Sequence, residues 1–346
     1  MKIMSIRTVV SVVTVVFLAL ILYAARQEIM HAWELLSTVN LWVLSLIVPA
    51  QVLVYFVAGE MMFCYLRDKK AIKHIRIWTQ ARMALEMNFV NHTLPSAGVS
   101  GMSYMTWRLG KYGISAGRAT VAQLVRFAAS FASFIVLLLV ALLAITIDGG
   151  VNRWIILLSS IVVFAMVAAT VLFVYLVSSP SRGRKFSHWI TDTGNRALRF
   201  MRIRSVVIPQ EKVGRFFIEM HDDYLELKKE RRLLLKPFLW GILFMCGEVL
   251  MFMITFWSLG AFINPAPVLI AYGLASTVGS FVPTPGGAGA YEATMVSFLA
   301  LAGVVAGTAI AGILLTRIIL MFGTIGLGYF FYQHALIKYG KSKSKA

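Results

Sequence analysis

The sequence has few acidic residues and almost no cysteine. Its 346 residues include 15 Asp and Glu and two cysteines. Both cysteines, Cys64 and Cys246, lie in apolar stretches, which argues against a disulfide framework and against a cysteine-based zinc site. The six histidines are scattered, and none pairs with another at the spacing of metal ligands. We therefore expect no bound metal ion.

Several common catalytic motifs are also missing. The chain contains no G-x-x-x-x-G-K-[ST] phosphate loop, no H-E-x-x-H string and no G-x-S-x-G string. These absences exclude ATP hydrolysis by a phosphate-loop mechanism, and they exclude the zinc-protease and serine-hydrolase chemistry that the other two motifs carry. We expect a protein that is not an enzyme and that needs no cofactor.

Apolar residues, in contrast, are abundant. Hydrophobic residues make up 59% of the chain, charged residues make up 14%, and the mean hydropathy is +0.78. A soluble domain has roughly 45–50% apolar and about 25% charged residues. The composition therefore predicts an all-α polytopic membrane protein, with residues 1–346 forming a single membrane domain. Six apolar runs are long enough to cross a bilayer as helices: about 8–25, 41–66, 120–147, 154–178, 237–260 and 306–337.

Two further apolar regions have a different pattern. Residues 78–108 and 267–303 are each interrupted in the middle by proline and glycine. Each arm has about 15 residues, which is too short to cross a bilayer comfortably. Each region is therefore predicted to be a re-entrant helical hairpin, which returns to the side of the membrane from which it enters.

The basic residues indicate the orientation in the membrane. With a cytoplasmic N-terminus and two re-entrant hairpins, 28 of the 33 Lys and Arg fall on the cytoplasmic side, whereas only Arg26 and Arg153 fall outside. This distribution satisfies the positive-inside rule. The other three, Arg82, Arg126 and Arg317, lie in or beside apolar runs. We expect a bacterial inner-membrane protein with both termini in the cytoplasm and with the two hairpins entering from opposite sides.

The two interrupted regions share a motif. They read Leu94-Pro95-Ser96-Ala97-Gly98-Val99-Ser100-Gly101 and Val282-Pro283-Thr284-Pro285-Gly286-Gly287-Ala288-Gly289. Both follow the pattern apolar-P-x-x-G-x-x-G, with an offset of 188 residues. A span with one glutamate precedes each motif, and a span with one arginine follows it. The pattern predicts an inverted repeat of residues 41–147 and 237–337, which is typical of secondary transporters.

The two interruptions are candidate binding sites. A broken helix in a membrane leaves backbone groups unpaired, so it is tolerated only inside protein or beside a wet cavity. The helix that follows presents N–H groups at its positive end. Residues 98–101 and 286–289 are therefore predicted to bind a phosphate or a carboxylate. The candidate residues of the two motifs are Pro95, Gly98, Gly101, Pro283, Pro285, Gly286, Gly287 and Gly289.

One arginine in the second half is surrounded by apolar residues. Arg317 costs about 2.5–3.5 kcal/mol on insertion scales, so it must face a partner or a cavity. Glu292, three residues after Gly289, is its predicted partner, and Glu248 is a second. The alternative is a buried ion pair that only fixes helix packing. The functional interpretation is a polar cavity that accepts a charged head group.

The first half has its own polar candidates. Arg126 and Glu86 are predicted to play roles analogous to those of Arg317 and Glu292, again with a structural ion pair as the alternative. His92 lies just before the first interruption. It either lines the cavity or is an ordinary buried or interfacial histidine.

These motifs resemble a known family. The string Pro283-x-Pro285-Gly286-Gly287-x-Gly289-x-x-Glu292, with an arginine in the next span, resembles the signature of the lysylphosphatidylglycerol synthase transmembrane-domain family, also called flippase-like. The stretch from Leu94-Pro95 to Trp107-Arg108-Leu109 resembles its other marker region, and the similarity in spacing covers about residues 40–335. The resemblance implies that Glu292 and Arg317 lie in a head-group cavity.

The same resemblance bears on what the protein does. The best understood members synthesise aminoacylated phosphatidylglycerol in a cytosolic C-terminal domain, and their membrane domain moves that lipid to the outer leaflet. Because this sequence ends at Ala346 after a short lysine-rich tail, we expect a stand-alone member without the synthase domain. Other members, often associated with glycosyltransferases, also lack that domain.

Residues 179–236 form a basic connector between the predicted repeats. This segment has 14 Lys and Arg and 7 Asp and Glu, and it contains two amphipathic stretches. We predict a cytoplasmic connector that lies against the membrane; the alternatives are recruitment of anionic lipid or docking of a partner enzyme. Nucleic-acid binding is not expected, because the positive-inside distribution already accounts for the charge.

The sequence thus predicts a lipid flippase. Its substrate would be an anionic or zwitterionic phospholipid, or a polyprenyl-phosphate-linked lipid. The alternatives are a secondary transporter of a small soluble anion and a membrane-embedded enzyme acting on lipid phosphates. The predicted partners are membrane lipids and a lipid-biosynthetic enzyme or glycosyltransferase. The oligomeric state stays open, a homo-oligomer included.

Overall fold

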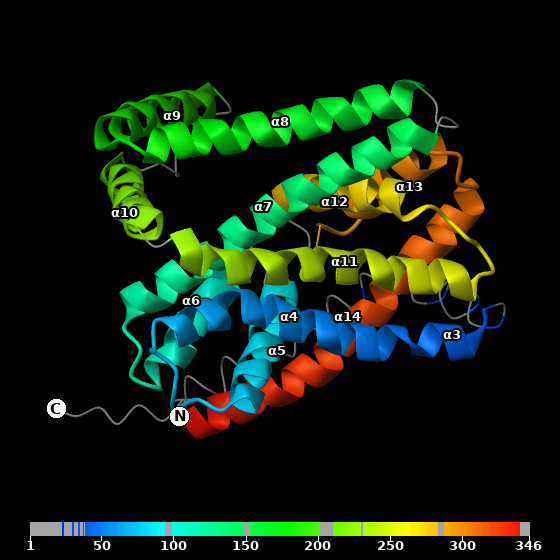
Figure 1. Ribbon diagram of the computed structural model, residues 1–346, viewed down its shortest axis with the longest axis horizontal. Helices are drawn as coiled ribbons and strands as arrows, with labels where there is room; N and C mark the ends of the chain where they lie inside the picture. Colours follow the sequence, from blue (N-terminus) through cyan, green and yellow to red (C-terminus); the bar gives the residue numbers. More distant parts are fainter. Residues whose placement is uncertain are drawn as a thin grey trace. The chain divides into compact units, whose positions relative to one another are not determined.

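The computed structural model describes residues 23, 30, 34, 37, 39–93, 99–148, 153–200, 210–229, 231–282 and 287–339. Every regular element in this part of the chain is a helix, so the predicted all-α class is confirmed there (Figure 1). The chain divides into two compact units: Met1–Ser159 with Lys236–Ala346, and Ser160–Leu235.

The first unit contains two series of helices. The first series consists of α3 (Leu41–Ser45), α4 (Ile47–Asp68), α5 (Ile77–Thr93), α6 (Val99–Gly110) and α7 (Ala116–Asp148). The second series consists of α11 (Leu235–Ser258), α12 (Pro265–Phe281), α13 (Ala290–Leu301) and α14 (Ala306–Tyr339). Asparagine side chains cap two of these helices: Asn40 accepts hydrogen bonds at the start of α3, and Asn264 does so before Pro265 of α12.

Four helical segments of the described chain are long and apolar enough to cross a membrane: Leu41–Asp68, Ala116–Ile147, Arg231–Ser258 and Ala306–Tyr339. They coincide with four of the six predicted spans. A fifth predicted span, 154–178, coincides with helix α8 (Arg153–Val177). The first predicted span, 8–25, lies outside the described residues apart from Tyr23.

The two series of helices match in order and length. Helices α4 to α7 have 22, 17, 12 and 33 residues, and α11 to α14 have 24, 17, 12 and 34. Both ends of α12 fall 188 residues after those of α5, which is the offset between the two sequence motifs. The short helices α5 and α6 occupy the first interrupted region, and α12 and α13 occupy the second. These matches support the predicted repeat, whose boundaries and opposite orientations stay predictions.

The two series exchange contacts with each other. Helix α5 packs on α14, and α12 packs on α7, so the first arm of each interrupted region lies against the long helix of the other series. Glycines permit these close approaches. A Cβ atom at Gly328 of α14 would lie 2.4 Å from the Cβ of Phe89 in α5, and one at Gly273 of α12 would overlap the ring of Phe134 in α7. Because α5 and α14 meet this way, residues far apart in sequence share one interior.

The crossing of α5 and α14 allows a direct test. We expect Gly328→Ala to destabilise the protein by roughly 1–3 kcal/mol, because the added methyl group meets the Cβ of Phe89 and the carbonyl of Leu85 rather than a flexible side-chain end. Gly326→Ala is the matched control, since a Cβ there meets nothing within 4 Å. It should be neutral or slightly stabilising, because alanine favours helix. Denaturant unfolding in detergent measures both variants, and equal stabilities would contradict the proposed contact.

Large apolar side chains on the long helices also face outward. On α7 the exposed residues include Phe131, Leu139, Val140 and Leu143. Exposed apolar surface on this scale is rare in soluble monomers. It is expected where helices contact lipid, because helices satisfy their own backbone hydrogen bonds. The first unit therefore has the surface of a multi-pass membrane protein.

The second unit consists of α8 from Ser160 onward, α9 (Pro180–Phe200), α10 (Gln210–Lys229) and the short 3₁₀ helix η1 (Arg231–Leu234). Helices α9 and α10 pack through Phe186 and Phe217, whose ring centroids are 5.6 Å apart. The Nδ1 atom of His221 hydrogen-bonds the carbonyl of Val177 at 2.7 Å and ties α10 to the end of α8. Trp189 remains 60% exposed on α9. Helices α9 and α10 of this unit lie in the predicted connector, whose position at the membrane stays a prediction.

Candidate functional site

The main candidate site contains the arginine that the sequence places in an apolar span. The Arg317 Nε atom lies 3.0 Å from the Glu292 Oε1 atom, so the predicted ion pair is confirmed. Both side chains are partly exposed, at 24% and 19%. The Arg317 guanidinium also stacks over the ring of Tyr291, 4.1 Å from its centroid. Helix α14 supplies the arginine, and the start of α13 supplies its two partners.

Glu292 has a second role at the start of its helix. Its Oε2 atom accepts a hydrogen bond of 2.6 Å from the backbone N–H of Gly289, whose φ of 88° suits glycine. One carboxylate thus caps α13 and pairs with Arg317. A substitution of Glu292 is therefore expected to affect the helix start and the charge balance together.

Two tyrosines connect this pair to Glu248. The Tyr272 hydroxyl of α12 interacts with the Glu248 carboxyl of α11 and with Ser276. Tyr291 also interacts with Ser276, and Glu248 lies within electrostatic range of Arg317. We name Glu248, Tyr272, Ser276, Tyr291, Glu292 and Arg317 the central polar cluster. It contains two carboxyl groups and one guanidinium.

His92, on the first series of helices, interacts electrostatically with this cluster. This residue lies near the end of α5, and its Nδ1 atom is 2.9 Å from the carbonyl of Asn88. Its ring is within electrostatic range of Arg317, in keeping with the packing of α5 on α14. The role of His92 in binding stays a prediction.

Glu86 has a different partner from the one suggested by the analogy with the second half. Its Oε2 atom accepts hydrogen bonds from the Arg108 Nε atom at 2.9 Å and from the Tyr104 hydroxyl at 2.8 Å. The Arg108 and Glu86 side chains are only 5% and 3% exposed. The Arg108 guanidinium also stacks on Tyr339, 4.1 Å from the ring centroid. This buried pair joins α5 to α6 and has the features of a structural ion pair.

Arg126 lies on α7 and forms an ion pair with none of the described acidic residues. Its side chain is partly buried on α7, and its buried Nε atom has no hydrogen-bond partner in the described structure. The guanidinium stacks on its neighbour Phe127, 4.7 Å from the ring centroid. The ion pairs of the described residues do not include Arg126. The expectation that Arg126 and Glu86 repeat the Arg317–Glu292 pair is therefore wrong.

The helix interruptions are only partly described. Pro95, Gly98, Pro283, Pro285 and Gly286 lie outside the described residues.

The sequence predicts N–H groups that are free to bind an anion at the two interruptions. Two of the described glycines there use their N–H groups differently. The N–H of Gly101 donates to the Asn91 Oδ1 atom at 3.0 Å, as the N–H of Gly289 donates to Glu292. Gly287, at a φ of 70°, packs directly on Gly279. Two N–H groups that the sequence suggested for a ligand therefore bind side chains of the protein, because an exposed helix start is costly in a membrane.

Several residues of these sites carry no clear signal in the sequence. Tyr272 and Tyr291 stand in apolar helices, where composition alone counts them as hydrophobic. Arg108 follows the first motif and is counted among the cytoplasmic charges. Asn91 could have been identified as a cap, because asparagine near an interrupted helix commonly accepts N–H groups.

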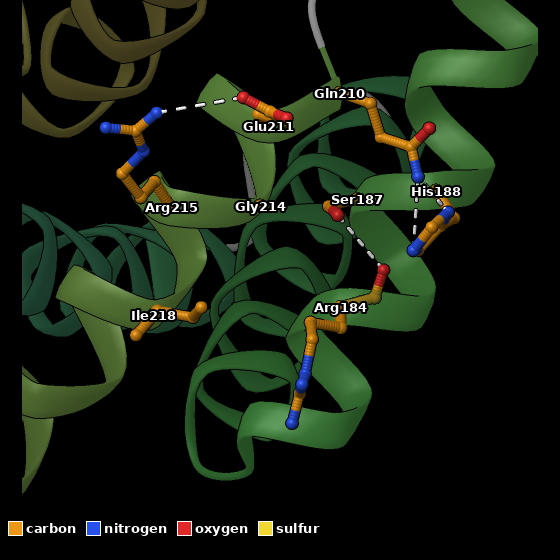
Figure 2. Close-up of a pocket in the computed structure, with 8 residues that line it drawn as sticks. All are labelled: Arg184, Ser187, His188, Gln210, Glu211, Gly214, Arg215 and Ile218. Atoms are coloured by element: carbon orange, nitrogen blue, oxygen red, sulfur yellow. Dashed lines mark hydrogen bonds and ion pairs between the residues drawn. The ribbon is translucent and has the colours of Figure 1, made fainter.

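A groove between α9 and α10 forms a separate basic site in the second unit. It has a volume of about 520 Å³ and is lined by Arg184, Ser187, His188, Gln210, Glu211, Gly214, Arg215 and Ile218. Figure 2 shows the Gln210 amide hydrogen-bonded to the His188 ring, and the Arg215 side chain directed toward Glu211 at 3.9 Å. The basic side chains are exposed, so water screens their charge. Recruitment of anionic lipid by this surface stays a prediction.

Comparisons with known proteins give the same family that the sequence motifs resemble. Residues 6–328 match the family described as "Lysylphosphatidylglycerol synthase TM region". The chain is also 25% identical over 234 residues to a "UPF0104 membrane protein" of Methanothermobacter thermautotrophicus (strain ATCC 29096 / DSM 1053 / JCM 10044 / NBRC 100330 / Delta H), a match that covers 66% of this chain and 67% of that protein. No solved structure matches the chain.

Proposed function

Because the chain belongs to the family of the lysylphosphatidylglycerol synthase transmembrane region, we propose that it moves a lipid between the two leaflets of a membrane. The substrate would be a phospholipid or a polyprenyl-phosphate-linked lipid. The observation that carries the proposal is the Arg317–Glu292 pair, which is partly exposed among apolar helices. A charged pair in that setting is costly unless it faces a polar cavity or ligand.

The proposed mechanism uses both series of helices. The lipid head group binds beside the central polar cluster, while the acyl or prenyl chains remain in the bilayer. The reciprocal packing of α5 on α14 and α12 on α7 supports a rocking movement of one half against the other. Such a movement would expose the cluster to each leaflet in turn. It requires no bond to be made or broken, so the protein acts as a transporter and not as an enzyme.

The proposed arrangement has six spans and two re-entrant hairpins in a bacterial inner membrane, with both termini in the cytoplasm. The basic surface of α9 and α10 then faces the anionic cytoplasmic leaflet. A lipid-biosynthetic enzyme or glycosyltransferase is the proposed partner at that side. The matching helix lengths and the distribution of basic residues support this arrangement.

Vesicles containing the purified protein test the proposed function. Fluorescent phosphatidylglycerol or phosphatidylethanolamine is placed in both leaflets, and dithionite bleaches the outer leaflet only. In protein-free vesicles about half of the fluorescence should survive, whereas movement of lipid to the outer leaflet should bring nearly all of it within reach of dithionite. An anion-sensitive dye in parallel vesicles distinguishes a soluble-anion transporter. Protein that moves phosphate or chloride but leaves every tested lipid in place would reject the proposal.

The hairpin arrangement can be tested by cysteine labelling. In a Cys64→Ala, Cys246→Ala background, Lys111→Cys and Val305→Cys introduce thiols into the loops after α6 and α13. Both positions are exposed, so labelling is not limited by burial. We expect a membrane-impermeant maleimide to label Lys111→Cys only from the cytoplasm and Val305→Cys only from outside. Labelling of both variants from one side would contradict the opposite orientations.

A further inference from the structure

The two halves of the membrane unit differ in their charge balance. In the first half, the carboxyl groups are occupied by nearby arginines. The Arg67 Nη1 atom of α4 lies 3.0 Å from the Glu60 Oε1 atom, and Arg108 pairs with Glu86. These two pairs use the carboxylates of the described α4–α7 interior, and Arg126 is left as an additional positive charge.

The second half has the opposite balance. An offset of 188 residues relates Glu60 to Glu248, but the residue related to Arg67 is Thr255. Glu248 therefore lacks an arginine on its own helix, and it shares the field of Arg317 with Glu292. Two carboxyl groups stand beside one guanidinium in the central polar cluster. The cluster therefore suits the hydroxyl or amine part of a head group better than its phosphate.

The local difference arises at the start of the second hairpin arm. In the second half, the carboxylate of Glu292 caps α13 and neutralises Arg317. In the first half, the neutral amide of Asn91 caps α6 through the N–H of Gly101. Helices α6 and α13 are related by an offset of 191 residues, three more than α5 and α12, and this offset relates Gly101 to Glu292 and Arg126 to Arg317. Where the second half has the carboxylate of Glu292 to pair with its arginine, the first half thus has Gly101, which has no side chain.

Arg126 nevertheless points toward protein and not toward lipid. It shares a face of α7 with Ala122, Ala129 and Ser133, which are 0%, 7% and 0% exposed. That face meets α4, α6 and α11: Ser130 contacts Met61, Gln123 hydrogen-bonds the carbonyl of Met102, and Ser133 hydrogen-bonds the carbonyl of Phe238.

A second polar group beside Arg126 also lacks a partner. Gln123 lies one helical turn away and is fully buried, and its Oε1 atom accepts no hydrogen bond in the described structure. A buried donor and a buried acceptor are therefore both unsatisfied in the same stretch of α7. Such groups are rare in native proteins, and each suggests a ligand or an ordered water.

We propose that Arg126 binds the phosphate group of the transported lipid, in a subsite separate from the central polar cluster. This inference rests on the proposed lipid transport. A guanidinium matches phosphate in charge and can donate two parallel hydrogen bonds to it. The anionic part of the lipid then occupies the half with the excess positive charge.

Binding of short-chain lipids to the detergent-purified full chain tests this subsite. The probes are dihexanoyl-phosphatidylglycerol and dihexanoylglycerol, which lacks the phosphate, and ligand-induced thermal stabilisation reports the affinity. Loss of one charge-assisted contact predicts that Arg126→Gln weakens phosphatidylglycerol binding by at least about tenfold. Arg126→Lys keeps the charge, so it should weaken binding less. Binding of dihexanoylglycerol should not change.

Arg82→Gln is the matched control, because Arg82 is also an arginine in an apolar region but stacks on Phe331. It should bind both probes like the wild-type protein. Unchanged phosphatidylglycerol binding by Arg126→Gln, an equal loss for both probes, or a wild-type protein that does not prefer the phosphate-bearing probe would overturn the subsite. A wild-type protein that binds phosphate as described but moves no lipid in vesicles would reject the transport proposal and leave the subsite intact.

Discussion

Replacing Arg317 by glutamine is expected to slow lipid movement in vesicles by roughly 10- to 100-fold, which corresponds to the loss of one or two charge-assisted hydrogen bonds. The variant leaves Glu292 and Glu248 without the only guanidinium of the central polar cluster. Their repulsion then disfavours the state in which a head group enters. The dithionite assay measures the rate at equal amounts of reconstituted protein.

Substitution of Glu292, the carboxylate of the pair, gives a second test. Glu292→Gln retains an oxygen that can accept the Gly289 N–H, so α13 should keep its cap while the charge is lost. We therefore expect slower lipid movement with a smaller loss of stability than Glu292→Ala produces.

Arg215→Gln provides the control for removing an arginine from an ion pair. Arg215 pairs with Glu211 at 3.9 Å on exposed α10, where the pair should contribute little. Lipid movement at the wild-type rate in both Arg317→Gln and Glu292→Gln would show that the pair only holds the helices together. Equal slowing by Arg215→Gln would point to a general effect of lost positive charge.

The long helices and the Arg317–Glu292 pair could be predicted from the sequence for the same physical reason. A membrane imposes a minimum length on an apolar helix and a penalty on an isolated charge. Runs of apolar residues therefore mark the helices. Arg317 needs a partner, and Glu292 is the acidic residue nearest to it in sequence. Both conclusions follow from local composition, which the sequence contains in full.

The partner of Glu86, and the lack of an ion pair at Arg126 among the described residues, could not be predicted in this way. Glu86 and Arg108 are 22 residues apart and meet only because α5 and α6 fold back on each other. The sequence alone placed Arg108 among the cytoplasmic charges, and the apparent symmetry of the halves suggested Arg126 instead. The cap on α6 also depends on this turn, because Asn91 and Gly101 lie on its two sides. Such pairings are set by tertiary structure and not by composition.

The largest stability effect is expected at the buried pair of α5 and α6. Arg108→Met leaves the Glu86 carboxylate, which is 3% exposed, with the Tyr104 hydroxyl as its hydrogen-bond donor among the contacts described above. Loss of one partner from a buried ion pair costs roughly 3–5 kcal/mol. The stacking of Arg108 on Tyr339 is lost as well, which loosens the contact between α6 and the end of α14. Denaturant unfolding in detergent should detect this loss directly.

The double variant Glu86→Leu with Arg108→Met separates the charge from the packing. It removes both ions, so no uncompensated charge stays buried, and replacing a buried pair by apolar residues is often neutral. We expect the double variant to recover most of the stability lost by Arg108→Met. Lys236→Met is the control, because Lys236 pairs with Asp68 at 2.8 Å but is 61% exposed, so its loss should cost less than about 1 kcal/mol. If the double variant is as unstable as Arg108→Met, then packing by the arginine stem, and not the unpaired carboxylate, stabilises this hairpin.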